Sequence, residues 1–257
     1  MLLAVDVGNT ETAVGLIDDG AIVDHWRIAT VSHRTGDEIA GLLAGFLALH
    51  DWRPRDVIDE VGIASVVPRL TSQWVEMCGK HLGLSPFIVG PGTKTGMRIA
   101  MKNPAEGGAD RVVNAVAAFE KYGGPCIVVD FGTATTFDVI SPDGDYLGGV
   151  IAPGIEVSME ALTTRAAMLT KVDLVEPEHV IGKSTSEALQ AGAVYGFAGQ
   201  IEGIVAAIRD ELGHSAKVVA TGGLAEMISR HAKVVDDVDP FLTLHGIDLV
   251  MHRQSPR

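Results

Sequence analysis

The stretch Val5-Asp6-Val7-Gly8-Asn9-Thr10-Glu11-Thr12 recurs in altered form as Val129-Asp130-Phe131-Gly132-Thr133-Ala134-Thr135-Thr136. At an offset of 124 residues, from Val5 to Val129, the valine, the aspartate, the glycine and the final threonine coincide, as do Asp19-Gly20 and Asp143-Gly144. Each copy has the pattern of an apolar strand, an acidic Gly/Thr turn, a second apolar strand and an Asp-Gly hairpin. We therefore expect two related half-domains, with phosphate-binding turns on both sides of a cleft.

The length of the chain agrees with this duplication. A chain of 257 residues forms one large domain or two small ones, and the offset favours two, each large enough to bury its own core. We place the expected domains at residues 1–114 and 115–257. Strands alternate with helices and each unit opens with hairpins, so the sequence predicts an α/β fold with mixed sheets flanked by helices.

Apolar periodicity and turn residues give the expected elements. The expected strands are residues 2–5, 13–17, 21–29, 61–66, 86–89, 126–130, 136–140, 146–151 and 217–220. The expected helices are residues 35–50, 70–82, 109–122, 155–164, 186–212, 224–231 and 244–252. The helix over 186–212 carries many small residues, which permit close packing either in the core or across a dimer.

The net charge of −13 bears on the partners of the chain, and no run of lysine or arginine forms a basic stripe. Such a surface repels a polyanionic backbone, so nucleic acid is not an expected partner. Cys78 and Cys126 are the only cysteines and give neither a disulfide framework nor metal-ligand spacing. The first residues lack a basic leader, and no window reaches the ~18 uninterrupted apolar residues of a membrane span. We expect a cytoplasmic protein without a membrane partner.

The two Gly/Thr turns are candidate phosphate sites, because such turns expose backbone N–H groups to which anions bind. An aspartate at a strand end holds Mg²⁺, directly or through water, beside the phosphates. Asp6 with Gly8-Asn9-Thr10 fits a metal and phosphate turn, and Asp130 with the residues after Gly132 fits a second one. Either copy alone reads as an ordinary turn, but the duplication favours the functional interpretation. Thr221-Gly222-Gly223 is a third, weaker candidate.

Gly182-Lys183-Ser184-Thr185 resembles the end of a P-loop but is not one. That motif requires a glycine five positions earlier, where Pro177 stands, and no clear strand precedes the turn.

Six motifs occur in the order found in a known family. They are DVGNT (6–10), NPAEGGADR (103–111), DFGTATTFD (130–138), GGVIAPG (148–154), GKST (182–185) and TGGLA (221–225). The chain resembles type III pantothenate kinases of the actin-like ATPase/sugar kinase superfamily from Met1 to about residue 252. The resemblance implies two ribonuclease H-like domains with the active site in the cleft between them, and a homodimer. It also implies phosphorylation of pantothenate by ATP to 4′-phosphopantothenate, the first step toward coenzyme A, with Mg²⁺ and a monovalent cation, K⁺ or NH₄⁺.

The resemblance also assigns roles to residues. Asp110 is implied as the general base, Asp130 as the ligand of the monovalent cation, and Asp6 as a ligand of Mg²⁺ through water. The implied pantothenate contacts are Met101, Gly108, Ala109, Asp110, Arg111 and Thr185, the last of them across the dimer. The implied ATP contacts are Asp6, Val7, Gly8, Asn9, Thr10, Glu11, Thr12, Ala13, Thr133, Gly222 and Gly223.

Structural alternatives exist for two of these residues. Asp110 also fits the N-cap of a helix over 111–122; the GADR context favours the catalytic role, and the two roles are compatible. Arg111 favours a substrate carboxylate or phosphate, while a surface ion pair with Glu106 or Glu120 is the alternative. Met101 stands where the family often has an aromatic residue; methionine still packs on apolar groups but offers no hydroxyl. Gly107 replaces a frequent valine and Glu11 a frequent asparagine.

Three other functions compete with this interpretation. A kinase or phosphatase of the same superfamily acting on a sugar, acetate or polyphosphate shares the two turns, but the GADR segment argues against it. A nucleotide-binding regulator without turnover is disfavoured because Asp110 and Asp130 are both present. A filament protein of the actin type is the least favoured at this length.

Overall fold

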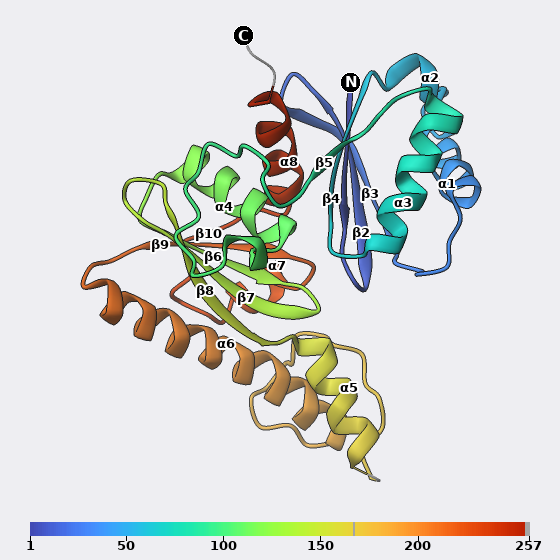
Figure 1. Ribbon diagram of the computed structural model, residues 1–257. Helices are drawn as coiled ribbons and strands as arrows, with labels where there is room; N and C mark the ends of the chain where they lie inside the picture. The colour runs from blue at the N-terminus through green and yellow to red at the C-terminus, as the bar shows by residue number, and fades with distance from the viewer. Residues whose placement is uncertain (167, 255–257) are drawn as a thin grey trace. The chain divides into compact units, whose positions relative to one another are not determined.

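The computed structural model describes residues 1–166 and 168–254, and its contacts divide the chain into two compact units (Figure 1). The first unit contains Met1–Ala117 and Phe241–Arg257, and the second contains Ala118–Pro240. This division differs from the expected one after residue 114, because the last helix of the chain packs on the first sheet and not on the second.

The first sheet is a mixed five-stranded sheet. Its spatial order is β3 (Ala21–Ala29), β2 (Glu11–Asp18), β1 (Leu2–Val7), β4 (Glu60–Ser65) and β5 (Phe87–Val89). Strand β1 is antiparallel to β2 and parallel to β4. Its register places Asp6 beside Ala13 on one neighbour and beside Ala64 on the other. The sequence-predicted acidic turn therefore follows a central strand of this sheet.

The second sheet repeats this order. It contains β8 (Tyr146–Pro153), β7 (Ala134–Ile140), β6 (Cys126–Phe131), β9 (Lys217–Gly222) and β10 (Asp237–Val238). Strand β6 is antiparallel to β7 and parallel to β9, as β1 is to β2 and β4. The same strand order and directions in both units confirm the expected duplication and the mixed sheets.

The hairpins of the two units differ in length. In the first unit, Asp18 pairs with Ala21, so Asp19 and Gly20 form a two-residue turn, with φ of 49° and 78°. Positive φ at both positions is the geometry that matches the twist of the flanking strands. In the second unit, Ile140 pairs with Tyr146, which leaves a five-residue connection (141–145) around the repeated Asp-Gly.

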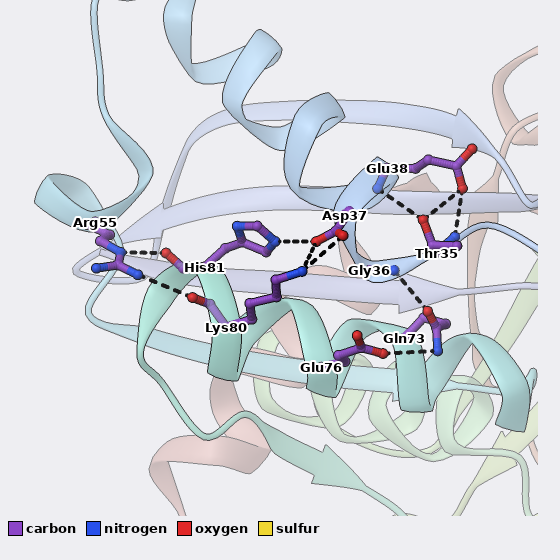
Figure 2. A network of polar contacts seen from close by, with 9 residues as sticks. All are labelled: Thr35, Gly36, Asp37, Glu38, Arg55, Gln73, Glu76, Lys80 and His81. Carbon is purple, nitrogen blue, oxygen red and sulfur yellow. Dashed lines mark hydrogen bonds and ion pairs between the residues drawn. The ribbon is translucent and has the colours of Figure 1, made fainter.

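One face of the first sheet is covered by α1 (Gly36–Ala48) and α3 (Pro68–Met77). Helix α1 begins with a capping box. The side chain of Thr35 accepts from the backbone N–H of Glu38, and the side chain of Glu38 accepts from the backbone N–H of Thr35. Polar contacts also join the start of α1 to α3 and to the turn that follows α3 (Figure 2): the N–H of Gly36 donates to Gln73 at 2.8 Å, and Asp37 accepts from Lys80 at 2.7 Å and contacts His81 at 2.7 Å. These hydrogen bonds, first from Lys80 and then from His81, lower the pKa of the exposed Asp37 carboxyl.

The opposite face of the first sheet is covered by α8 (Leu242–His252) and the first half of α4 (Ala109–Tyr122). Figure 1 shows α8 on the side of the sheet away from α1 and α3. Two glycines admit α8: a Cβ on Gly15 would lie 2.7 Å from Leu244, and a Cβ on Gly62 would lie 2.7 Å from Ile247. The first unit is thus complete only when the end of the chain is in place.

In the second unit, α6 (Thr185–Leu212) and α7 (Ala225–Ser229) pack on one face of the sheet, and α5 (Ile155–Arg165) follows β8. Among the described residues, α6 alone has the length and hydropathy of a membrane-spanning helix. A core helix passes the same test, and Val194, Ile201 and Val205 are buried against the sheet as in a core helix.

Three short elements were not expected from the sequence: α2 (Pro54–Val57), the 3₁₀ turn η2 (Pro104–Glu106) and strand β10. Two expected helices are altered. The one over 70–82 divides into α3 and a π-helical turn η1 (Cys78–Leu82), which ends at Gly83 with φ of 76°. The one over 224–231 shortens to α7.

Candidate active site

The first Gly/Thr turn closes between β1 and β2. The N–H of Gly8 donates to the carbonyl of Glu11 at 3.0 Å, and a Cβ on Gly8 would lie 2.8 Å from that oxygen, so only glycine fits. Asn9, Thr10 and Glu11 are exposed at the tip, while Asp6 is half-buried at the strand end. The structure thus places Asp6 and the turn residues together, as predicted.

Two residues assigned to this turn face inward. Val7 is fully buried in the core under α1 and α3. Thr12 is buried as well, and its hydroxyl lies 2.9 Å from that of Thr30, at the end of β3. Thr30 in turn donates its N–H to the carbonyl of Thr10 at 2.8 Å. Thr30 therefore supports the turn, a role that no motif signalled.

The second turn is one residue shorter than the first. Val7 pairs with Thr12, whereas Phe131 pairs with Thr135, so the structural counterpart of Thr12 is Thr135 and not Thr136. Both counterparts are buried. The N–H of Gly132 donates to the carbonyl of Ala134 at 3.1 Å, and Thr133 is exposed. The offset of 124 residues therefore holds up to Phe131, before the turn, and no longer holds at Thr135, after it.

The start of α5 lies against the second turn. The N–H of Gly154 donates to the carbonyl of Thr133 at 3.2 Å, and a Cβ on Gly154 would collide with that oxygen. No side chain caps α5, so the positive end of this helix is adjacent to Thr133. The GGVIAPG motif contains this glycine, but no role for it was predicted.

Asp130 and the third candidate turn are neighbours in the second sheet. Strand β9 pairs Thr221 with Asp130 and Gly222 with Phe131. A Cβ on Gly222 would lie 2.6 Å from a carboxylate oxygen of Asp130, and the φ of 94° also favours glycine. Thr136 pairs with Asp130 on the other side. Asp130 is therefore flanked by two threonines, where its counterpart Asp6 is flanked by two alanines.

The GADR segment forms the beginning of α4. The carbonyl of Gly108 accepts from Val112 at 3.0 Å, which places Asp110 in the first turn of the helix. Asp110 is thus not the N-cap residue, and the alternative of a capping aspartate is wrong in that form. Its carboxylate accepts from the N–H of Arg111 at 2.9 Å and would lie 2.5 Å from a Cβ on Gly108. The side chain folds over Gly108 and is half-buried.

Met101 lies beside this segment, with its sulfur 3.9 Å from where a Cβ on Gly107 would stand. Between them is η2, which Asn103 caps by accepting from the N–H of Ala105 at 3.3 Å. An Asn-Pro pair indicates such a turn, so this element could have been predicted from the sequence.

Thr185 is the first residue of α6 and is exposed. The hydroxyl of Ser184 accepts from Glu187 at 3.2 Å, and the N–H of Lys183 donates to the Glu187 carboxylate at 2.6 Å. GKST is thus a helix cap, in agreement with its rejection as a P-loop. No contact in the described structure joins Thr185 to the other candidate residues.

Both cysteines are buried, as expected for core thiols, and burial raises the pKa of each to about 12. Within residues 1–166 and 168–254, no group of three or more His, Cys, Asp or Glu side chains is arranged to hold a metal ion.

The duplicated mixed sheets, each with an acidic Gly/Thr turn after its central strand, give this chain the two-unit α/β fold of actin-like ATPases and sugar kinases. Component A of (R)-2-hydroxyglutaryl-CoA dehydratase from Acidaminococcus fermentans shares this fold, with a TM-score of 0.57 at 14% identity over 99% of both chains.

Other relatives are much more similar in sequence than component A. The family model for type III pantothenate kinase matches residues 2–207. The type III pantothenate kinase of Streptomyces griseus is 51% identical over the full length of both chains, and that of Moorella thermoacetica is 51% identical over 99% of this chain and 100% of its own. This chain belongs to the type III pantothenate kinase family.

Proposed function

We propose that this protein transfers the γ-phosphoryl group of ATP to the terminal hydroxyl of pantothenate, giving 4′-phosphopantothenate in the first step of coenzyme A biosynthesis. Membership of the family supports the reaction and its substrates. The observation that carries the mechanism is the half-buried Asp110 carboxylate in the first turn of α4, folded over Gly108.

Asp110 acts as the general base in this proposal. In phosphoryl transfer to an alcohol, the hydroxyl proton leaves late, as the new P–O bond forms, so a carboxylate suffices to receive it. The Asp110 carboxylate lies in the first turn of α4 and accepts from the N–H of Arg111. This contact fixes the direction of the carboxylate, which helps to align it with the hydroxyl.

The neighbours of Asp110 contact pantothenate. Gly108 and Ala109 offer backbone close to the carboxylate, and Met101 offers a flexible apolar side chain beside them. The guanidinium of Arg111 suits an anion of either substrate. Thr185, exposed at the start of α6, contributes its hydroxyl to the site of the partner subunit.

ATP binds to Asp6, Val7, Gly8, Asn9, Thr10, Glu11, Thr12 and Ala13 in the first unit and to Thr133, Gly222 and Gly223 in the second. The exposed backbone at Asn9 and Thr10 suits phosphates, while the buried Val7 and Thr12 shape the turn from within. Mg²⁺ bound with ATP would neutralise phosphate charge. Asp6 fits it, because Mg²⁺ is commonly held by one or two carboxylates, several waters and the phosphates.

Asp130 would hold the monovalent cation, K⁺ or NH₄⁺, which the family resemblance implies. The flanking Thr136 and Thr221 give this position more oxygen atoms than the alanines give Asp6. Weakly charged cations of this size bind to such oxygen-rich positions without the strict octahedral geometry that Mg²⁺ demands.

The working unit is a homodimer in the cytoplasm. Gly192, Gly196, Gly199 and Gly203 form an exposed stripe on α6, and nothing stands within 4 Å of where their Cβ atoms would be. Such a stripe allows a second helix to approach closely. Apolar side chains are also exposed on the edge strand β8 and after it, among them Val150, Ile151, Val180 and Ile181. Patches of this kind mark association surfaces.

The test is an assay of the purified protein with ATP, Mg²⁺ and pantothenate, in KCl and in a buffer free of monovalent metal and ammonium ions. We expect 4′-phosphopantothenate, identified by mass spectrometry, in KCl and little without it. No product in either buffer, from folded protein that binds ATP, would contradict the proposal and favour a regulator or another acceptor.

Asp110→Asn keeps the size of the side chain and removes the base. We expect turnover to fall by about a hundredfold to ten-thousandfold, the usual contribution of a positioned base, with an unchanged circular dichroism spectrum. Glu120→Gln, an exposed acid near the other end of α4, is the control and keeps full turnover. An Asp110→Asn variant as active as this control would exclude Asp110 as the base.

A further inference from the structure

The end of α8 is hydrogen-bonded to a segment more than 150 positions earlier in the chain. The guanidinium of Arg253 donates through Nη1 to the carbonyl of Thr95 at 2.6 Å, and Gln254 donates through Nε2 to the carbonyl of Lys94 at 2.5 Å. Both partners lie in the first unit. A hydrogen bond from a charged donor is stronger than one between neutral groups, so the Arg253 contact is the stronger of the two.

The segment is shaped to receive the guanidinium. Thr95 is 6% exposed, and its hydroxyl accepts from the N–H of Met97 at 3.2 Å, which turns the chain. Gly96 adopts a φ of 74°, and a Cβ there would lie 3.2 Å from Nη1 of Arg253. Glycine therefore serves both the left-handed backbone conformation and the close approach of the arginine.

The anchored segment leads directly to the proposed pantothenate site. Residues 93–103 contain neither a helix nor an extended strand, and only Ile99 forms a backbone bridge, so side-chain contacts such as that of Arg253 help to fix their path. Met97 and Ala109 both pack on the apolar cluster that contains α8. Met101 lies between them in the sequence, and its sulfur is 3.9 Å from where a Cβ on Gly107 would stand. Displacing Thr95 would therefore move Met101 relative to Gly108 and Asp110.

We propose that Arg253 is a positioning residue for the pantothenate site: by holding the Thr95 carbonyl, it fixes the segment that places Met101 beside the GADR turn. This inference rests on the proposed function. Arg253 acts through the segment and needs no contact with substrate. Loss of its hydrogen bond should weaken pantothenate binding and leave ATP binding and the chemical step unchanged.

Arg253→Met tests this, because methionine keeps an apolar stem and removes the donor; Arg253→Lys retains a charge and a donor. The matched control is Arg55→Met, since Arg55 also donates to two backbone carbonyls in the first unit, those of Lys80 and His81 (Figure 2). For each variant, we would measure KM for both substrates, kcat, Tm and amide hydrogen exchange of residues 93–103.

For Arg253→Met, we expect about a tenfold rise in KM for pantothenate and about tenfold faster exchange in residues 93–103, since one charge-assisted hydrogen bond is lost. KM for ATP and kcat should not change, the pattern of lost binding that is equal in ground and transition states. Arg253→Lys should lie between Arg253→Met and the wild type. Arg55→Met should change neither KM nor this exchange.

Unchanged exchange in Arg253→Met would overturn the proposal whatever the activity. Faster exchange with an unchanged KM for pantothenate would overturn it too, as would an equal rise of both KM values with a drop in Tm. If the wild-type protein does not phosphorylate pantothenate, the proposed function fails, while the exchange comparison still decides whether Arg253 holds the segment.

Discussion

The carboxylates of Asp6 and Asp130 stand at the same place in their units, each at the next-to-last position of a central strand. What distinguishes them is the residues beside them. Alanines flank Asp6, so water and phosphate oxygens have to complete the shell of any cation there. Threonines flank Asp130, and Gly222 leaves room for its carboxylate. The two copies of the aspartate therefore have different surroundings, as the proposed binding of two different cations requires.

Asp130→Asn should separate these roles. The amide keeps the size of the side chain but loses a charge whose attraction to a bound cation is about 1–4 kcal/mol between water-like and protein-surface surroundings. We expect the KCl concentration for half-maximal activity to rise at least about tenfold, with KM for ATP little changed. Asp143→Asn, in the exposed hairpin of the same unit, is the control. A potassium dependence equal to that of the control would remove Asp130 from the cation site.

The sequence predicted the single residues of the turns unevenly. The Asp-x-Gly pattern occurs in both turns because each strand end needs the same backbone path, and the sequence therefore predicted both turns. The length of the second turn could not be predicted from the sequence. An alignment at a constant offset pairs Thr12 with Thr136, whereas the strand pairing places Thr135 at the position that corresponds to Thr12. The supporting roles of Thr30 and Gly154 were not predicted, because the residues that they contact, Thr10 and Thr133, are distant in the chain.

Helix α8 illustrates how an element is fitted to its neighbours. Its Gly246 faces the backbone of Val113 in α4, and a Cβ at Gly246 would collide with the Val113 carbonyl. Periodicity predicted both helices, because each has apolar residues at helical spacing. It could not predict their contact, and it missed α2 and β10, which are too short to show a period.

Gly246→Ala should destabilise the first unit by about 1–3 kcal/mol, the usual cost of overpacking. Gly45→Ala is its control, because Gly45 lies exposed in α1 with nothing within 4 Å of a Cβ, and alanine there should stabilise by about 0.5–1 kcal/mol. Urea unfolding of the two variants measures the difference. Equal stabilities would mean that α4 and α8 can separate without cost.

At the scale of the whole molecule, the fold followed from the repeat, since two copies of one strand order account for both sheets. The division of the chain did not follow. A boundary after residue 114 assumes that each unit is continuous, whereas Phe241–Arg257 belongs with the first unit. Composition and pattern carry no information on which of two similar sheets a final helix will cover.

The proposed dimer is a property of the whole molecule and has a direct test. The wild-type protein should elute in light-scattering chromatography at twice the chain mass of 27.0 kDa. Gly199→Leu places a bulky side chain in the exposed stripe of α6 and should shift the protein toward the monomer. Gly45→Leu, on an exposed helical glycine of α1, should not. A Gly199→Leu variant that remains as dimeric as the Gly45→Leu control would place the contact elsewhere.

The return of α8 to the first sheet has a consequence for synthesis. Ribosomes release a chain from its amino end, so every strand of the first sheet emerges before α8, which covers its second face together with the first half of α4. The second unit is continuous in sequence, so all of its residues have been synthesised before the last helix of the first unit emerges. A product that stops short of residue 241 would lack α8 and expose the apolar face formed by Leu2, Ala4, Ile17 and Ala64. Such exposed faces are bound by chaperones and cleaved by proteases, so the fold distinguishes finished chains from interrupted ones.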